Sequence, residues 1–231
     1  MFLSYYYFEY YIFMIPAIIL VFAAQIMVQS RYKKYSSVGN SRSMTGAQMA
    51  EYLLRQNGVT DVAITLTGGQ MSDHFDPRSK TIALSQEVFN GTSVAAVCIA
   101  AHEAGHAVQH ATGYFPLRIR SFIIPISNIG SRISIPLIII GGLLDFPVLV
   151  NVAIIFFALS AFLQFITLPV EFNASRRAIS VISGSGMFSE ADVTGSRKML
   201  SAAAMTYVAA FAQSLLSLLY YVLRFTNNRR R

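Results

Sequence analysis

The sequence predicts a mainly α-helical membrane protein with about four transmembrane helices and a small α+β segment outside the lipid. Of its 231 residues, 54% are hydrophobic and only 13% are charged, which is about half the charged fraction of a typical soluble protein. The apolar residues gather in four long stretches, and about 20 consecutive apolar residues suffice for a helix to cross a bilayer. The single cysteine, Cys98, permits no intrachain disulfide and so excludes a disulfide-stabilised secreted scaffold.

The first apolar stretch, residues 10–28, predicts a permanent N-terminal membrane anchor within residues 1–30. No basic residue precedes it, which is atypical of a cleavable signal peptide. Tyrosines on its N-terminal side resemble the aromatic belt found at membrane interfaces. They are Tyr5, Tyr6, Tyr7, Tyr10 and Tyr11.

The following segment, residues 31–120, has the composition of a soluble α+β unit. Apolar spacing predicts a helix over residues 43–56, with Thr45 as its N-cap. Alternating and β-branched residues predict strands over 59–66 and 81–84. A long helix is expected over residues 92–112.

The second half of the chain predicts three more membrane helices. Two apolar stretches form a helix pair within residues 121–168, joined by a tight turn at Asp145. A polar segment follows over residues 169–201, in which we expect a helix to start just after Pro169. Residues 202–231 are expected to form a last membrane helix with a basic tail, Arg229–Arg231.

The distribution of lysine and arginine predicts the orientation, because these residues are enriched in short cytoplasmic segments. Nine lie in residues 31–120 and four in residues 169–201, whereas the N-terminal tail and the turn at Asp145 contain none. Both polar segments are therefore expected in the cytoplasm, although the basic C-terminal tail conflicts with this if the last helix spans fully. The net charge of +7 is thus assigned to membrane orientation. No soluble basic face remains for nucleic acid, which we exclude as a partner.

The strongest chemical signal is the sequence His102-Glu103-Ala104-Gly105-His106. Histidines four residues apart share one face of a helix, so both imidazoles can bind a single Zn²⁺. Zinc lowers the pKa of a bound water to about 7. Glu103 is placed to accept the proton of that water, as a general base.

A catalytic zinc site needs a third protein ligand, and the sequence favours Glu171. His110 lies on the same straight helix as the histidine pair and cannot easily complete a tetrahedron. Gln109 and Thr112 exclude the metzincin spacing, which needs glycine and histidine at these positions. Of the four acidic residues further along, only Glu171 lies close after a membrane helix on the predicted side of the histidines, whereas Asp145 is on the opposite side.

Several segments resemble the YugP-type neutral zinc metallopeptidases of bacteria, and the resemblance covers about residues 44–210. It implies an integral membrane zinc peptidase of bacterial origin with one Zn²⁺. The site is also distantly similar to the gluzincin-like HtpX and CAAX-processing proteases, whose third ligand is the glutamate of an E-x-x-x-D motif. This likeness implies a small gluzincin-like domain at the cytoplasmic face, but Ser175 stands where that motif has aspartate. The matching segments are residues 73–77, 102–110, 168–178 and 200–209.

The residues that line the substrate cleft are less defined by the sequence. One interpretation is that the strand over residues 81–84 is a sheet edge that pairs with an extended peptide, with His74 at the border of the cleft. The alternative is that the segment around Asp76 is only a polar turn. Candidates for stabilising the transition state or lining the cleft are His74, Tyr207 and Arg176, with Tyr114 and Arg177 as further donors.

The leading functional prediction is an integral membrane zinc endopeptidase that cleaves membrane or membrane-proximal proteins in the cytoplasm. One alternative is an intramembrane protease of the site-2 kind, with Asp145 as the third ligand. Another is a non-catalytic membrane scaffold that keeps zinc for structure, although such a site has no need of Glu103. With so few membrane helices, a second copy of the chain or a regulatory membrane partner is also expected.

Overall fold

The computed structural model describes the backbone from Phe2 to Asn227 and the side chains of residues 10–225. The predicted tyrosines Tyr5–Tyr7 and the tail Arg229–Arg231 lie outside the residues whose side chains are described. Contacts divide the chain into two compact units. One, called here the helical unit, comprises Met1–Gln25, Ile119–Leu168 and Thr206–Arg231. The other, called the mixed unit, comprises Ile26–Arg118 and Pro169–Met205.

Four long helices run through the structure. Each is long and apolar enough to cross a membrane, which confirms the predicted number of spans by length and composition. Three of them divide between the helical unit and the mixed unit, and the fourth, α5 (Phe115–Leu143), lies almost entirely in the helical unit. The four are α1 (Phe2–Ser36), α5 (Phe115–Leu143), α6 (Pro147–Gly184) and α7 (Glu190–Asn227).

Within the helical unit, small and aromatic residues set the helix contacts. Gly130 of α5 lies directly against the ring of Phe156 of α6, where a Cβ would approach a ring carbon to 2.4 Å. Between α1 and α7, the ring centroids of Tyr10 and Tyr220 lie 5.1 Å apart, and the two rings meet edge to face. The turn between α5 and α6 has Asp145 at φ 50°, in the left-handed region, as a tight connection requires.

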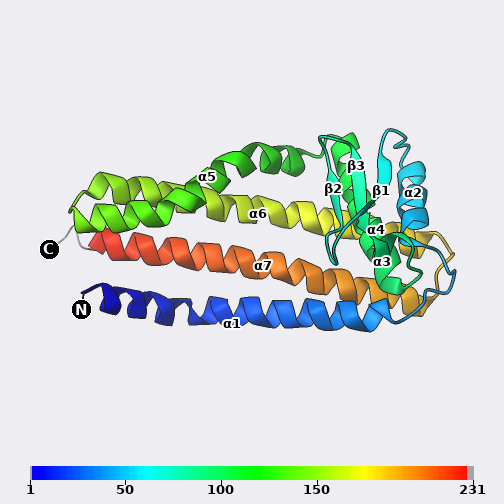
Figure 1. The fold of residues 1–231 in the computed structure, drawn as a ribbon, viewed down its shortest axis with the longest axis horizontal. Helices are drawn as coiled ribbons and strands as arrows, with labels where there is room; N and C mark the ends of the chain where they lie inside the picture. The colour runs from blue at the N-terminus through cyan, green and yellow to red at the C-terminus, as the bar shows by residue number, and fades with distance from the viewer. Residues whose placement is uncertain (1, 228–231) are drawn as a thin grey trace. The chain divides into compact units, whose positions relative to one another are not determined.

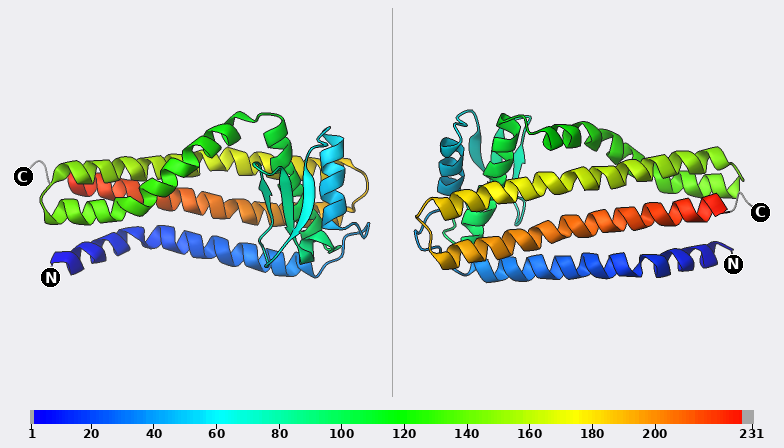
Figure 2. Two further views of the ribbon diagram at one scale, coloured as in Figure 1. Left: turned by 45° about the horizontal axis from the view of Figure 1, so that its top comes forward. Right: turned by 180° about the vertical axis from the view of Figure 1, so that it is seen from behind.

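The mixed unit holds a three-stranded sheet and three shorter helices, gathered beside the ends of α1, α6 and α7 that belong to this unit (Figures 1 and 2). Its core is formed by α4 together with α2 and strand β3, through buried residues such as Met49, Leu53 and Ile82. Its own elements are α2 (Gly46–Gln56), β1 (Ala63–Thr67), β2 (His74–Asp76), β3 (Thr81–Ser85), α3 (Gln86–Phe89) and α4 (Val94–Ala111).

The two main helices of the mixed unit begin where their capping residues dictate. At α2, the Thr45 hydroxyl accepts the backbone N–H of Gln48, whose side chain accepts the Thr45 N–H in return, forming a capping box. At α4, the Ser93 hydroxyl accepts the N–H of Ala96. The observed helices therefore begin within three residues of the starts that the sequence predicts.

The order of the strands corrects the prediction for residues 81–84. The sheet runs β1-β3-β2, with β3 parallel to β1 and antiparallel to β2, so this strand is central rather than an edge. Ile82 and Leu84 are fully buried, as befits a strand paired on both sides. The segment expected as an alternative polar turn instead contains the edge strand β2, which is too short for an alternation of residues to reveal it.

A second correction concerns Pro169. The sequence predicts a helix start after this proline, but α6 continues through it from Pro147 to Gly184. A proline removes one backbone donor and is tolerated in long apolar helices where neighbouring groups compensate. Glu171 therefore lies in a helix interior, and its side chain is fixed by the helix rather than by a terminus.

Candidate metal centre

The two histidines of the motif project from one face of α4. Their Nε2 atoms lie 3.2 Å apart, and the two rings meet edge to face with centroids 4.7 Å apart. The neighbouring positions Ala101, Ala104 and Gly105 are buried, so small residues bring this part of α4 close to other elements. Both imidazoles remain partly accessible, at 14% and 12% side-chain exposure.

Helix α6 supplies a carboxylate to the same point. The Oε2 atom of Glu171 lies 3.3 Å from Nε2 of His102 and 3.5 Å from Nε2 of His106, and the side chain is only 3% exposed. This approach depends on a glycine, because a Cβ at Gly105 would lie 2.9 Å from the backbone oxygen of Ala174. The two helices thus touch backbone to backbone one turn from Glu171.

The three donor atoms fit a zinc ion. Zinc–nitrogen and zinc–oxygen bonds of about 2.0–2.1 Å in a tetrahedron place two ligand atoms about 3.3–3.4 Å apart. The observed separations of 3.2, 3.3 and 3.5 Å match this value. Among the described residues, this is the one group of three or more potential ligands that converges in this way, and it could hold a metal. Three protein ligands leave one tetrahedral position open, as in catalytic rather than structural zinc sites.

Each histidine has a polar partner on its other nitrogen. Nδ1 of His106 lies 3.0 Å from Oε1 of Gln109, and Nδ1 of His102 lies 3.3 Å from the hydroxyl of Ser175. Ser175 thus occupies the place beside a ligand that the resemblance assigns to an aspartate. In the sequence, Gln109 excludes the metzincin spacing and belongs to the matching segment 102–110, but nothing there predicts its contact with His106. The other partners of the Gln109 side chain, Val170 and Asn173, lie more than 60 residues further along the chain.

Glu103 lies between the two histidines in sequence and is partly buried. Burial raises the pKa of its carboxyl above the usual range, Glu171 and Asp73 raise it further, and His102 and His106 oppose the shift. A carboxylate whose pKa moves toward neutrality is better suited to accept and return a proton. Burial alone would lower the pKa of His106, but its hydrogen bond with Glu171 raises it, so a proton and a metal ion compete for this nitrogen.

The other predicted site residues are placed less distinctively. His74 lies on β2 with its ring exposed, and its Nδ1 is 2.7 Å from the backbone oxygen of Ser72. Arg176 is exposed on α6. Tyr207 and Asp145 both belong to the helical unit.

The further donors considered from the sequence make contacts near Glu171. The Tyr114 hydroxyl donates to the backbone oxygen of Pro169 at 3.4 Å, and Nε of Arg177 donates to Oδ1 of Asn173 at 2.9 Å. His110, set aside as a ligand, is exposed, and its ring lies 5.7 Å from that of Phe75 on β2. The Tyr114 contact ties the loop after α4 to α6, and the His110 contact ties the C-terminal part of α4 to the sheet, whereas the Arg177 contact lies within α6.

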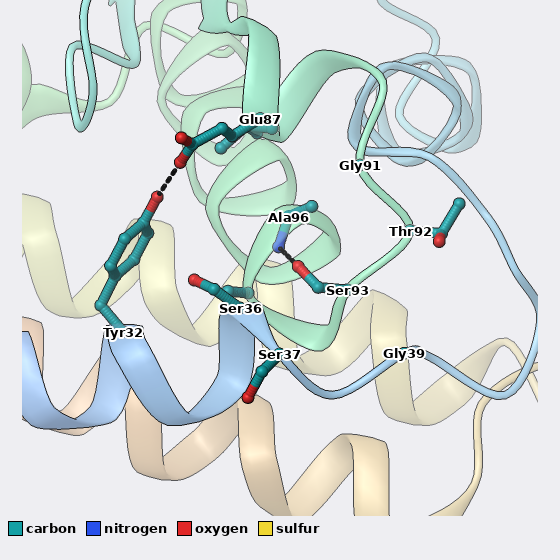
Figure 3. A pocket seen from close by; sticks show the side chains of 11 residues that line it. Tyr32, Ser36, Ser37, Gly39, Glu87, Gly91, Thr92, Ser93 and Ala96 are labelled. Atoms are coloured by element: carbon teal, nitrogen blue, oxygen red, sulfur yellow. Dashed lines mark hydrogen bonds between the residues drawn. The ribbon is translucent and has the colours of Figure 1, made fainter.

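The mixed unit also contains a cavity of about 450 Å³ between the end of α1, α3 and the start of α4. Figure 3 shows that the Tyr32 hydroxyl donates to Glu87 across it, at 3.0 Å, and that the Ser93 hydroxyl is occupied by the α4 cap. None of its lining residues is a member of the His102–His106–Glu171 cluster. The cavity is therefore a separate feature of the unit.

Comparison with known proteins agrees with this geometry. The profile of a family described as "Putative neutral zinc metallopeptidase" matches residues 10–226. The chain is 43% identical over 216 residues to "Putative membrane protease YugP" of Bacillus subtilis (strain 168), an alignment that covers 93% of this chain and 96% of that protein. No solved structure matches the chain. The cluster that could hold a metal and the extent of these matches lead to one conclusion: the chain belongs to the neutral zinc metallopeptidase family.

Proposed function

We propose that this protein is an integral membrane zinc endopeptidase that hydrolyses peptide bonds of membrane or membrane-proximal proteins. The observation that carries the proposal is the convergence of His102, His106 and Glu171 on one point. Glu103 interacts electrostatically with all three. A purely structural zinc site gains nothing from a partly buried acid held between two of its ligands. One zinc ion is expected, since one such cluster is present among the described residues.

The roles of the residues follow from their placement. His102, His106 and Glu171 would hold the metal, which when bound supplies Lewis acidity and lowers the pKa of a coordinated water to about 7. Glu103 takes up the proton that the attacking water loses and returns it to the amine that leaves. The donor that stabilises the developing negative charge is sought among His74, Tyr207 and Arg176.

The mixed unit also offers a place for an extended peptide. Strand β2 pairs with β3 on one side only, so its other edge has unpaired backbone groups. The contact between Phe75 and His110 places this strand against the C-terminal half of α4, which carries His106. A peptide that adds to this edge by strand pairing would run beside the helix of the metal ligands. This supports a polypeptide substrate.

We further propose that the chain spans the cell membrane several times, with the metal centre on the cytoplasmic side. The four apolar helices support the spans. The nine basic residues of segment 31–120 and the four of segment 169–201 support the side, because such residues are retained in the cytoplasm. Because the chain has only about four membrane helices, we also propose that it associates with a second copy or with a regulatory membrane protein.

The alternative with Asp145 as a ligand finds less support than Glu171. Asp145 is not a member of the cluster of potential ligands, whereas Glu171 contributes an oxygen within 3.5 Å of both histidines. The scaffold alternative predicts a bound metal without proteolysis, and the presence of Glu103 argues against it.

The test is a side-by-side measurement of zinc content and proteolysis for purified wild type, Glu103→Ala, Glu171→Ala and Asp145→Ala in detergent. We expect Glu103→Ala to retain zinc but cut nothing, Glu171→Ala to lose both, and Asp145→Ala to retain both. Loss of zinc in Asp145→Ala would support the intramembrane alternative instead. Stoichiometric zinc in a wild type that cleaves no membrane protein would favour the scaffold.

A further inference from the structure

We propose that Gln109 is a positioning residue that fixes which nitrogen of His106 faces the metal and that ties this ligand to the α6 segment carrying Glu171. The inference rests on the metal site proposed above. Gln109 is fully buried on α4, one turn beyond His106, and its side chain bridges α4 and α6. A buried amide has up to four hydrogen-bonding positions, so it can orient its neighbours as well as fill space.

The orientation of the Gln109 amide follows from partners whose chemistry is unambiguous. Its Nε2 lies 2.7 Å from the backbone oxygen of Val170, which can only accept, so this end of the amide is the NH₂ group. The second partner of Nε2 is Oδ1 of Asn173, at 3.0 Å. That atom is also fixed as an oxygen, because the Arg177 guanidinium donates to it and can only donate.

The remaining end of the Gln109 amide is therefore a carbonyl oxygen that can only accept. It lies 3.0 Å from Nδ1 of His106, so Nδ1 must carry the proton of this contact. In the neutral imidazole, the unprotonated nitrogen is then Nε2, the atom that points at His102 and Glu171. A backbone carbonyl and an arginine, relayed through two amides, thus determine which nitrogen is free to bind a metal.

The contact at His102 differs in kind. Its Nδ1 meets the hydroxyl of Ser175 at 3.3 Å, and a hydroxyl can rotate to donate or accept. Ser175 consequently supports the ring without selecting its tautomer. Of the two contacts, only the one from Gln109 determines which ring nitrogen carries the proton.

The same side chain also links the two helices of the site. Val170, whose carbonyl accepts from Gln109, immediately precedes Glu171 in α6. A single amide thus contacts a ligand of α4 on one side and the backbone adjoining the ligand of α6 on the other. Outer partners of this kind typically change metal affinity 10- to 100-fold when removed.

The test compares zinc affinity, measured by competition with a chromogenic chelator, for the full chain in detergent and for Gln109→Leu and Gln109→Glu. We expect Gln109→Leu to bind zinc about 10- to 100-fold more weakly. Gln109→Glu keeps an acceptor for Nδ1 of His106 but loses the donor to Val170 and Asn173, so its zinc affinity should lie between that of Gln109→Leu and that of the wild type. Val97→Ala, which trims another buried side chain of α4, is the packing control and should keep the wild-type affinity.

A measurement on the wild type is independent of how the variants fold. Long-range ¹H–¹⁵N spectra of the zinc-loaded, ¹⁵N-histidine-labelled protein should show His106 protonated at Nδ1, with slow exchange of that proton. Protonation of His106 at Nε2 would overturn the proposal, as would equal zinc affinities of wild type and a folded Gln109→Leu, or of Gln109→Leu and Gln109→Glu. A wild type that binds no zinc would instead refute the proposed metal site itself, whereas a loss of proteolysis alone leaves the role of Gln109 unaffected.

Discussion

The closest helix contact in the site predicts that Gly105→Ala will weaken metal binding without removing any ligand. The added methyl carbon would lie 2.9 Å from the backbone oxygen of Ala174 and 3.3 Å from its Cα. Ordinary van der Waals contact begins at 3.4 Å, so α4 and α6 must separate locally by about 0.5 Å. Neither partner is a flexible side chain, and hence the strain cannot be relieved by a change of rotamer.

That separation acts directly on the donor atoms, because His102 and His106 flank Gly105 and Glu171 lies one turn from Ala174. A displacement of about 1 Å in a catalytic site costs about 100-fold in rate, so about 0.5 Å predicts a loss of about 10-fold in kcat/KM. The same displacement moves Glu171 away from the histidines and should therefore weaken zinc binding. Overpacking costs about 1–3 kcal/mol of stability, and the better helix propensity of alanine offsets about 1 kcal/mol of this.

The assay is zinc affinity by chelator competition together with thermal unfolding, with Gly142→Ala as the matched control. Gly142 also lies within a helix, α5, but a Cβ there has no neighbour within 4 Å. The control should keep its zinc affinity, and its stability should be equal to that of the wild type or up to about 1 kcal/mol higher. A Gly105→Ala protein that binds zinc as tightly as wild type would refute the argument that this backbone contact sets the distance from Glu171 to the histidines.

Further outcomes are expected from other contacts. Ser175→Ala should weaken zinc binding by only a few-fold, less than Gln109→Leu in the same competition assay, because its hydroxyl lies at 3.3 Å and dictates no tautomer. Asp192→Ala should lower the free energy of unfolding by about 1–3 kcal/mol, measured by thermal or denaturant unfolding, since its carboxylate accepts from Ser41 and from the Ser189 N–H; unchanged stability would show that these bonds contribute nothing. Removal of zinc by a chelator should destabilise the protein by about 2.7 kcal/mol relative to a zinc concentration 100 times the dissociation constant, and an unfolding temperature indifferent to zinc would contradict the metal site. Cys98 should resist a maleimide at pH 8 in the folded protein but react once unfolded, because burial raises the pKa of its thiol to about 12; rapid labelling of the native protein would contradict its burial.

The parts of this structure that the sequence predicts are those set by local chemistry. The spacing of His102 and His106 on a helix, the cap at Thr45 and the four apolar spans depend on residues near one another in the chain, and the structure has them as expected. The sequence favours Glu171 only by elimination among four acids and by a family resemblance, because no local spacing links it to the histidines. The convergence of its oxygen with the histidines is a finding of the structure.

The features that the sequence does not predict depend on residues far apart in the chain or on the tolerance of a long helix for a proline. The central position of β3 is decided by a three-residue partner, β2, whose sequence carries no strand signal of its own. The helix continues through Pro169, because a long apolar helix tolerates a proline that a sequence pattern reads as a helix start. Gln109 reads as an ordinary helix residue until Val170 and Asn173 are brought beside it from α6.

The separation of the ligands along the chain has a consequence for biosynthesis. Between His106 and Glu171 lie all of α5 and the part of α6 that precedes Pro169, the two middle spans of the proposed topology. At about 5–20 residues per second of translation, Glu171 leaves the ribosome roughly 3–13 s after His106. A nascent chain therefore carries two ligands and Glu103 but no complete site until that helical hairpin has been made. The order of the helices thus delays completion of the proposed metal site until both middle spans have been synthesised.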